Sequence, residues 1–276
     1  MVNKLPGDSA EPIAAVQAGK GMADLPRMLK TLAVGKDFKG RDFLPAAVHR
    51  LDVPVSGCTL FARTPEALAF LNARFRGASD AALGFSAVKP AGNGNTDETA
   101  AAKAPAKAAS VEKIYWAIVE IPQPGKAQRV LMAEPGEEGE WKHWIKAGTG
   151  ENKSIAYDEE DPGRKPGLLR YRFVGAGSHY LFLEITLLTG RHHQIRAQLA
   201  RMGLHIKGDL KYGAKRSERG GGIRLHGYSL SFPDPASVRN SARSIDGGEL
   251  IRVQALPLLR DPLWEAFEAA HILSRK

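Results

Sequence analysis

Runs of apolar residues predict β-strands along much of the chain. The clearest run is 113–121 (KIYWAIVEI), which is apolar on both alternating faces and so has the pattern of a central strand. Three further segments have strand patterns: 58–63 (CTLFAR), 179–188 (HYLFLEITLL) and 222–232 (GIRLHGYSLSF). These segments indicate a protein built around β-sheet.

A helical pattern follows the first of these strands, at residues 64–77. Thr64 is a capping residue, Pro65 suits the first turn, and Gly77 can end the helix. The apolar stripe of this helix is formed by Leu68, Leu71 and Phe75.

Two later segments are also helical by pattern. Residues 189–203 place Ile195, Leu199 and Met202 on one face, and a glycine at 203 can end the helix. The last helix is expected to begin at Asp261, a capping residue followed by proline. Because the strands outnumber the helices and do not alternate regularly with them, we expect an α+β fold rather than a doubly wound parallel sheet.

Two stretches lack a strong hydrophobic pattern. Residues 86–112 are rich in Ala, Gly, Lys and Pro and contain no aromatic residue, so they cannot bury enough apolar surface to offset the entropy of ordering them. We expect a flexible insertion there, within a single domain that spans 1–276. Residues 122–167 carry many Pro, Gly and charged residues, which predicts turns and short strands.

Composition adds an anionic partner to this picture. The chain has 276 residues, 43% of them hydrophobic, and a formal net charge of +9. A basic excess of this size favours nucleic acid as a partner, although a generic basic enzyme would have the same balance. The single cysteine, Cys58, excludes an internal disulfide, and no apolar run is long enough to span a bilayer. Without a secretory signal, we expect a cytoplasmic protein.

The candidate chemical groups are ambiguous when each is taken alone. Arg196 lies at the edge of the apolar face of the 189–203 helix, where a guanidinium needs a carboxylate partner. Tyr115 lies early in the central strand, where its hydroxyl needs a partner. His192 and His193 would point about 100° apart on a helix and could not easily share a ligand, so packing is favoured for both. Ser56 lacks the elbow motif of a serine nucleophile.

A family resemblance connects these groups. The segments HRLDVPVSGCTLFART, KIYWAIV, TGRHHQIRAQLARMGLHIKGDLKYG and RLHGYSLSFPDP occur in this order and closely resemble the motifs of RluA-family RNA pseudouridine synthases. The opening VNKLPG is also similar to a segment of that family. The chain departs from the family at Val55, where Thr is usual, and at His192, where Thr or Ser is usual.

The resemblance implies a mixed, largely antiparallel β-sheet core with flanking helices and a cleft that takes RNA. It implies isomerisation of uridine to pseudouridine in ribosomal or transfer RNA, with no cofactor and no metal. Asp52 would be the catalytic aspartate, Tyr115 the tyrosine against the base, and Arg196 the partner of the aspartate. The residues expected to bind substrate are Arg50, His49, Arg191 and Gln194. No S4-type RNA-binding domain is expected before the catalytic region, and we expect a monomer.

Two other functions fit parts of the sequence. The first is a catalytically inactive RNA-binding relative that acts in RNA folding or ribosome assembly, although the intact set of Asp52, Tyr115 and Arg196 weighs against it. The second is a metal-dependent hydrolase that uses the histidines, which lack ligand spacing. A carboxylate beside a guanidinium suits the proposed isomerisation, because breaking a glycosidic bond develops positive charge on the sugar.

Overall fold

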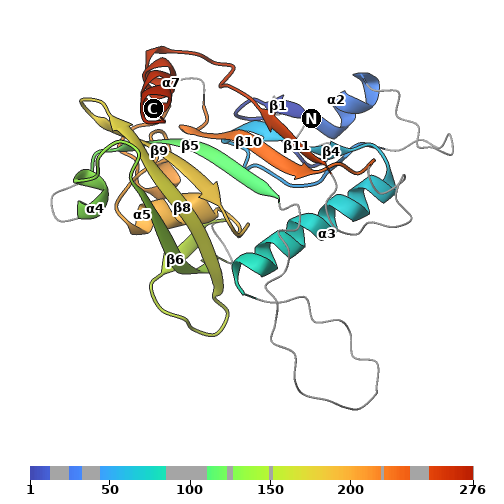
Figure 1. The fold of residues 1–276 in the computed structure, drawn as a ribbon, viewed down its shortest axis with the longest axis horizontal. Helices are drawn as coiled ribbons and strands as arrows, with labels where there is room; N and C mark the ends of the chain where they lie inside the picture. Colours follow the sequence, from blue (N-terminus) through green and yellow to red (C-terminus); the bar gives the residue numbers. More distant parts are fainter. Residues whose placement is uncertain are drawn as a thin grey trace.

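The computed structural model describes residues 1–12, 25–32, 44–84, 111–122, 127–148, 152–218, 221–236 and 249–275. Its centre is a nine-stranded sheet in the order β1-β3-β10-β5-β9-β8-β6-β7, with β11 paired to β10. The strands of this sheet are β1 (Val2–Lys4), β3 (Ser56–Thr59), β5 (Glu112–Glu120), β6 (Glu138–Ala147), β7 (Ser154–Tyr157), β8 (Lys165–Ala176), β9 (Tyr180–Leu187), β10 (Leu225–Pro233) and β11 (Leu250–Gln254). Only β3 and β10 pair in parallel among these described strands, so the mixed, largely antiparallel α+β fold is confirmed (Figure 1).

Helices flank this sheet, and a short two-stranded ribbon lies beside it. The ribbon pairs β2 (Ala46–Ala47) with β4 (Phe61–Ala62). The helical segments are α2 (Leu25–Leu32), α3 (Pro65–Ala82), α4 (Gln128–Leu131), α5 (Gln194–Arg201), the 3-10 helix η1 (Leu210–Tyr212) and α7 (Pro262–Leu273). None of the helices in the described ranges could cross a membrane.

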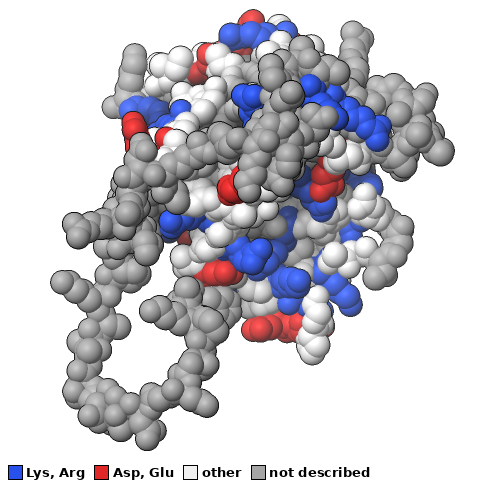
Figure 2. All heavy atoms as spheres, turned by 90° about the vertical axis from the view of Figure 1, so that its right-hand side faces the viewer, with Lys and Arg blue, Asp and Glu red and all other residues white. Residues whose placement is uncertain are grey.

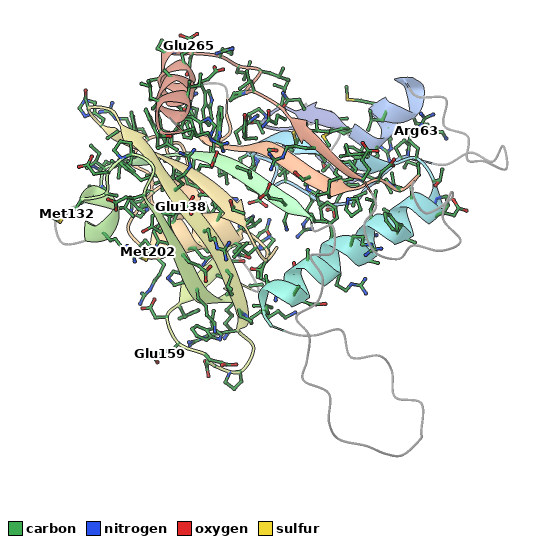
Figure 3. All side chains as sticks on the ribbon, viewed as in Figure 1. Arg63, Met132, Glu138, Glu159, Met202 and Glu265 are labelled. Atoms are coloured by element: carbon green, nitrogen blue, oxygen red, sulfur yellow. The ribbon has the colours of Figure 1, made fainter. Side chains whose placement is uncertain are left out.

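Hydrophobic clusters lie on both faces of the sheet. Figure 3 draws the described side chains on the ribbon. Along β5, alternate residues face opposite sides: Tyr115 and Ala117 join one cluster with α5, whereas Trp116 and Ile118 join another with α7. A third cluster packs α3 against β3 and β10, with Leu71 of α3 at its centre. The alternation along a strand that is buried on both faces explains why its sequence is apolar throughout.

Several sequence predictions are confirmed, with shifted ends. The central strand is β5, the 179–188 run is β9, and the 222–232 run is β10. Asp261 caps α7 by accepting hydrogen bonds from the amides of the second and third helical residues, and Thr64 caps α3. The predicted 58–63 strand is instead split between β3 and β4.

Three sequence predictions were wrong. Helix α3 does not end at Gly77 but continues to Ala82, because a glycine in an exposed helical turn costs only about 1 kcal/mol. The prediction for 122–167 is wrong in part: the region contains the short strand β7, but also the long strand β6 and the start of β8. The 189–203 helix begins only at Gln194. The predicted insertion lies outside the described residues, except for 111 and 112.

A close approach of two backbones joins β3 to β10. Gly57 is paired with Gly227, and a Cβ atom on Gly57 would lie 2.3 Å from the carbonyl oxygen of Gly227. Beside them, the Ser56 hydroxyl is 2.8 Å from Nδ1 of His226, whose Nε2 donates to the carbonyl oxygen of Ala255. The His226 ring is fully buried, so the Ser56–His226 pair joins the strands and does not form a nucleophile. These contacts fix the strand that follows the Asp52 loop.

Candidate active site

The Asp52 loop connects β2 to β3, and Lys4 holds it in place. The Lys4 side chain is fully buried, and its ammonium donates to the carbonyl oxygens of Leu5, Val53 and Val55 at 2.7–3.0 Å. Burial lowers the pKa of Lys4 to about 8. The lysine of the opening VNKLPG segment is therefore part of the support for the HRLDVPVSG loop, a connection that the sequence does not reveal.

Arg196 connects Asp52 to a second carboxylate. Its Nη1 donates to Asp52 Oδ2 at 3.0 Å, as the resemblance implied, while its Nε and Nη2 hold Asp209 in a fork at 2.7 and 2.8 Å. The Asp209 side chain is 1% exposed, and that of Arg196 is 5% exposed. Although burial opposes the charge, the hydrogen bonds and charges of both carboxylates raise the pKa of Arg196. Asp209 thus fixes the guanidinium that orients Asp52.

His193 is a third group at Asp52, and its position corrects the sequence prediction. It precedes α5 with a left-handed φ of 50° and is not part of the helix. The rings of His192 and His193 are therefore stacked, with centroids 3.8 Å apart, instead of diverging by a helical turn angle. His193 Nε2 lies 3.6 Å from Asp52 Oδ2, whereas His192 bonds to the Ser154 hydroxyl.

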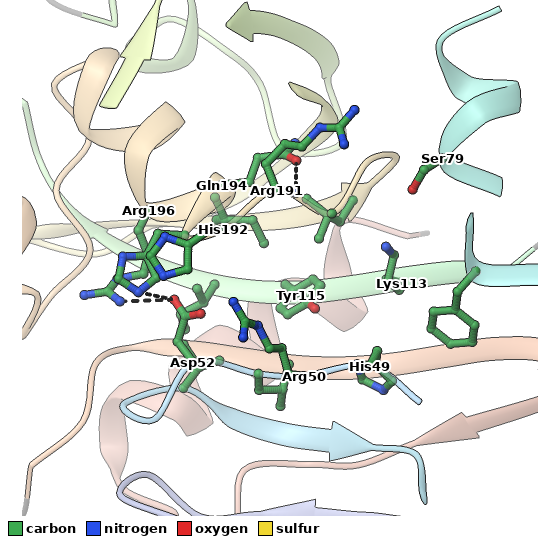
Figure 4. A pocket seen from close by; sticks show the side chains of 18 of the residues that line it. His49, Arg50, Asp52, Ser79, Lys113, Tyr115, Arg191, His192, Gln194 and Arg196 are labelled. Atoms are coloured by element: carbon green, nitrogen blue, oxygen red, sulfur yellow. Dashed lines mark hydrogen bonds and ion pairs between the residues drawn. The ribbon is translucent and has the colours of Figure 1, made fainter. Parts of the chain in front are cut away.

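These contacts all involve one oxygen of the Asp52 carboxylate. Arg196 and His193 both face Oδ2, and Oδ1 has no partner among the described residues. The side chain is 21% exposed and borders a cavity of about 380 Å³ (Figure 4). The carboxylate is thus anchored through one oxygen and offers the other to a molecule in the cavity.

Tyr115 and Lys113 project from β5 into the same cavity (Figure 4). Tyr115 is 7% exposed, and its hydroxyl has no hydrogen-bond partner within the described part of the chain. Burial raises the pKa of this phenol, and the negative charge of Asp52 raises it further, so it stays neutral. Burial lowers the pKa of Lys113 to about 8, and no described carboxylate pairs with it. Lys113 was not singled out from the sequence.

The expected substrate-binding residues divide into two groups. Arg50 and Arg191 line the cavity, and the Arg50 side chain is 55% exposed. Arg50 also borders a second hollow, of about 400 Å³, which Asp52 lines as well. Arg191 is anchored by its Nε to the carbonyl oxygen of Pro166. Both guanidinium groups can therefore reach a ligand from the walls of the site.

His49 and Gln194 have structural bonds in addition to their place on the cavity wall. His49 Nε2 accepts from the amide of Leu60, and burial lowers the pKa of the ring to about 3. The Gln194 amide has partners for both its oxygen and its nitrogen, among them the hydroxyl of Thr189 and the carbonyl oxygen of Leu168. These contacts make Gln194 a support for the loop before α5; its contact with substrate stays a prediction.

The cations near the motifs are more dispersed than their sequence positions suggest. Lys211 borders the second hollow at Asp52. Lys207, Lys215 and Arg216 instead line a separate hollow, and Lys207 there is ion-paired with Glu218. Figure 2 shows Lys and Arg side chains in several groups on the face that carries α2 and α3.

This arrangement suits acid–base or nucleophilic chemistry by one carboxylate. It combines an anionic oxygen, a neutral phenol and cations in a cavity large enough for a flipped nucleotide base. Within the described ranges, no group of His, Cys, Asp or Glu could hold a metal ion. The residues that sequence reasoning missed are Lys4, Lys113, His193 and Asp209; for Asp209, the need of Arg196 for a buried partner was the available signal.

Comparisons with known proteins agree with the resemblance. The family model for RNA pseudouridylate synthases matches residues 94–201, which include Tyr115 and Arg196 but not Asp52. The chain is 29% identical over 196 residues to RNA pseudouridine synthase 3, mitochondrial, of Oryza sativa subsp. japonica. Over these residues the chain is similar to RNA pseudouridylate synthases, as the motif resemblance implied.

Further pseudouridine synthases extend this comparison. An uncharacterized RNA pseudouridine synthase of Zymomonas mobilis is 26% identical over 192 residues, which are 68% of this chain and 67% of that protein. The rice match covers 70% of this chain, but this chain spans only 37% of the rice protein. Human RNA Pseudouridylate Synthase Domain Containing 1 shares the fold over 98% of this chain and 82% of its own, with a TM-score of 0.56 at 19% identity. The sequence-based assignment to pseudouridine synthases is confirmed.

Proposed function

We propose that this chain is an RluA-type pseudouridine synthase that isomerises specific uridines in ribosomal or transfer RNA. The observation that carries the proposal is the Asp52 carboxylate. Its Oδ2 is held by Arg196, and its Oδ1 is left open to the cavity that Tyr115 lines. A carboxylate with one anchored and one accessible oxygen is equipped for attack or for charge stabilisation.

The reaction is a balanced rearrangement. The bond between C1′ of the ribose and N1 of the uracil breaks, a bond between C1′ and C5 forms, C5 loses a proton, and N1 gains one. No oxidant or reductant is consumed. Attack of the carboxylate on the sugar, its addition to the base, and elimination would all use a lone pair on Asp52, and Oδ1 supplies it in each route.

The walls of the cavity suit a flipped uridine. The aromatic ring of Tyr115 offers a surface for stacking, and enzymes that act on a base in folded RNA must take that base out of its stack. Arg50 borders both hollows that Asp52 lines, so its guanidinium can contact RNA that lies in either of them. The net charge of +9 supports phosphate contacts in general.

Mapping of pseudouridine in ribosomal and transfer RNA tests this proposal. We expect at least one modified uridine to be lost from cells that lack the gene and to return when the gene is restored. An inactive RNA-binding relative would give the same map with and without the gene. The expected monomeric state and cytoplasmic location stay predictions.

A further inference from the structure

We infer that His193 is a positioning residue, a neutral imidazole whose Nε2–H faces Asp52 Oδ2 because the Tyr212 hydroxyl fixes its tautomer. Its function is to hold the carboxylate so that Oδ1 is the reactive oxygen. This catalytic consequence rests on the proposed function, whereas the tautomer itself does not.

The hydrogen bonds of Tyr212 determine the tautomer. Its hydroxyl oxygen accepts from the amide of Ser154 at 2.8 Å and lies 3.0 Å from His193 Nδ1. A phenol has one hydrogen to donate, and Nδ1 of His193 is the acceptor that the described residues offer it. Tyr212 is 5% exposed, so a hydroxyl hydrogen without an acceptor would be costly. Nδ1 is therefore the unprotonated nitrogen.

The other side of the ring leads to the same assignment. His193 Nε2 lies 3.6 Å from Asp52 Oδ2. An Nε2 lone pair facing a carboxylate oxygen would be repelled, whereas an N–H facing it is attracted. Both ends of the imidazole therefore favour the form with hydrogen on Nε2.

The charges around His193 keep this ring neutral. Burial is the largest effect, and together with the nearby cations it lowers the pKa of His193 to about 4, although Asp52 opposes the shift. The charged and titratable groups that face the ring are Asp52, Arg196, His192, Lys211 and Tyr212. Burial also raises the pKa of Tyr212 to about 12, so the phenol keeps its hydrogen at neutral pH.

A neutral donor has a specific consequence for Asp52. The neutral imidazole N–H orients the carboxylate without placing a second full positive charge beside it. The carboxylate therefore retains the negative charge that the reaction needs. The hydrogen bond from Arg196 and the electrostatic attraction of the His193 Nε2–H, 3.6 Å away, both act on Oδ2 and oppose rotation of the carboxylate. Oδ1 then faces the cavity before any substrate binds.

Nitrogen NMR of histidine-labelled protein tests the tautomer directly. We expect the His193 signals of the Nε2–H form at pH 7, without protonation of the ring down to about pH 5. In Tyr212→Phe, which removes only the hydroxyl, the share of the Nδ1–H form should rise, because only the Asp52 contact then favours the Nε2–H form. His226 is the internal control: its Nε2 donates to the carbonyl oxygen of Ala255, and its signals should not change. A His193 ring protonated at Nδ1, or charged at pH 7, would overturn the inference.

A second variant tests the effect on catalysis. His193→Asn replaces the imidazole with a shorter side chain, so the Nε2–H near Asp52 is lost, and Asn tolerates the left-handed backbone conformation at this position. We expect the single-turnover rate of pseudouridine formation to fall roughly 10- to 100-fold, with RNA affinity unchanged. An unchanged rate would reject the positioning role even if the tautomer is as expected. If the wild-type protein forms no pseudouridine, the proposed function fails, and the NMR result still decides the tautomer.

Discussion

Lys113 is a desolvated cation in the cavity, on the same side of β5 as Tyr115. Burial lowers its pKa to about 8, and no carboxylate among the described residues compensates its charge. An anion that enters the cavity would restore the interaction energy that burial removes. An RNA phosphate is the anion that the proposed function supplies.

The first prediction concerns this charge. Lys113→Met keeps the length of the aliphatic stem but removes the ammonium, and it should weaken RNA binding about tenfold at pH 7. Because Lys113 loses its proton as the pH rises through about 8, the affinity of the wild type should fall between pH 7 and 9. Filter binding measures the RNA affinity of the wild type and of Lys113→Met at pH 7 and at pH 9.

Lys113→Arg is the matched control, since it keeps the charge and does not titrate in this range. It should bind RNA with a weaker dependence on pH than the wild type, while Lys4 titrates equally in both proteins. Equal affinities of the wild type and Lys113→Met at both pH values would show that Lys113 does not contact RNA.

Among individual residues, the sequence identified some side chains of the site but not the residues that hold them in place. The prediction that Arg196 pairs with Asp52 is confirmed, because a guanidinium on a buried face needs a carboxylate and the motif resemblance named which one. The need of Arg196 for a buried carboxylate could be read from the sequence, but nothing local indicates that Asp209 supplies a second one. His193 was missed because a histidine predicted within a helix cannot be expected to take a left-handed conformation.

Among the elements, the contact between β3 and β10 holds the Asp52 loop most directly. The second prediction is that Gly57→Ala destabilises the protein by at least about 2 kcal/mol. The new Cβ would collide with the backbone of Gly227, and the φ of +123° at Gly57 is strained for any residue with a side chain. Chemical denaturation measures the change. Gly77→Ala, where a Cβ would meet no atom within 4 Å, is the control and should be neutral or stabilising.

Helix α7 is docked on the sheet through a buried ionic cluster at Glu184. The Glu184 carboxylate interacts with Arg172, His271 and Arg275 at 2.6–3.2 Å. Burial alone would raise the pKa of Glu184, but the hydrogen bonds from His271 and Arg172 and their charges lower it to about 2, from an ordinary 4.5. The folded state thus binds this proton more weakly than the unfolded state does.

The third prediction follows from that difference. A depressed carboxyl pKa contributes stability above pH 4.5, and this contribution of about 3 kcal/mol is lost as the pH falls from 4.5 toward 2. Glu184→Gln should therefore be less stable than the wild type at pH 7, and this gap should narrow in acid. Denaturation midpoints at pH 7, 4 and 3 measure it; a constant gap would show that Glu184 does not titrate as described.

The elements themselves were only partly predictable from local pattern. Strand β6 has an alternating buried set at Trp141, His143 and Ile145, but charged residues and glycine obscured it. Helix α5 begins later than its pattern suggests, since tertiary contacts hold His193 outside the helix. The caps at Thr64 and Asp261 were predictable because they depend on residues within one turn.

For the whole molecule, the fold class could be predicted but the strand order could not. The parallel pairing of β3 with β10 joins residues that are 170 positions apart, and no local signal selects such a partner. The overall positive charge could be read directly from the sequence, whereas its distribution could not. Lys207, for example, lies in a different hollow from Asp52 and is neutralised by Glu218.

The fourth prediction concerns this charge. Since phosphate contacts release counterions, the logarithm of the RNA affinity should fall linearly with the logarithm of the salt concentration. Binding titrations between 50 and about 200 mM salt give the slope. An affinity that does not depend on salt would exclude an RNA complex dominated by phosphate contacts.

The most direct test of the account is the single-turnover conversion of the RNA target by Asp52→Asn. This change preserves the size of the side chain and removes the negative charge and most of the nucleophilicity, so pseudouridine formation should fall to background. RNA affinity should stay within about twofold of the wild type, because phosphate contacts supply most of it. Asp161→Asn, at an exposed carboxylate paired with Arg164, is the control and should convert RNA normally. Near-normal conversion by Asp52→Asn would contradict the central claim that the Asp52 carboxylate carries the reaction.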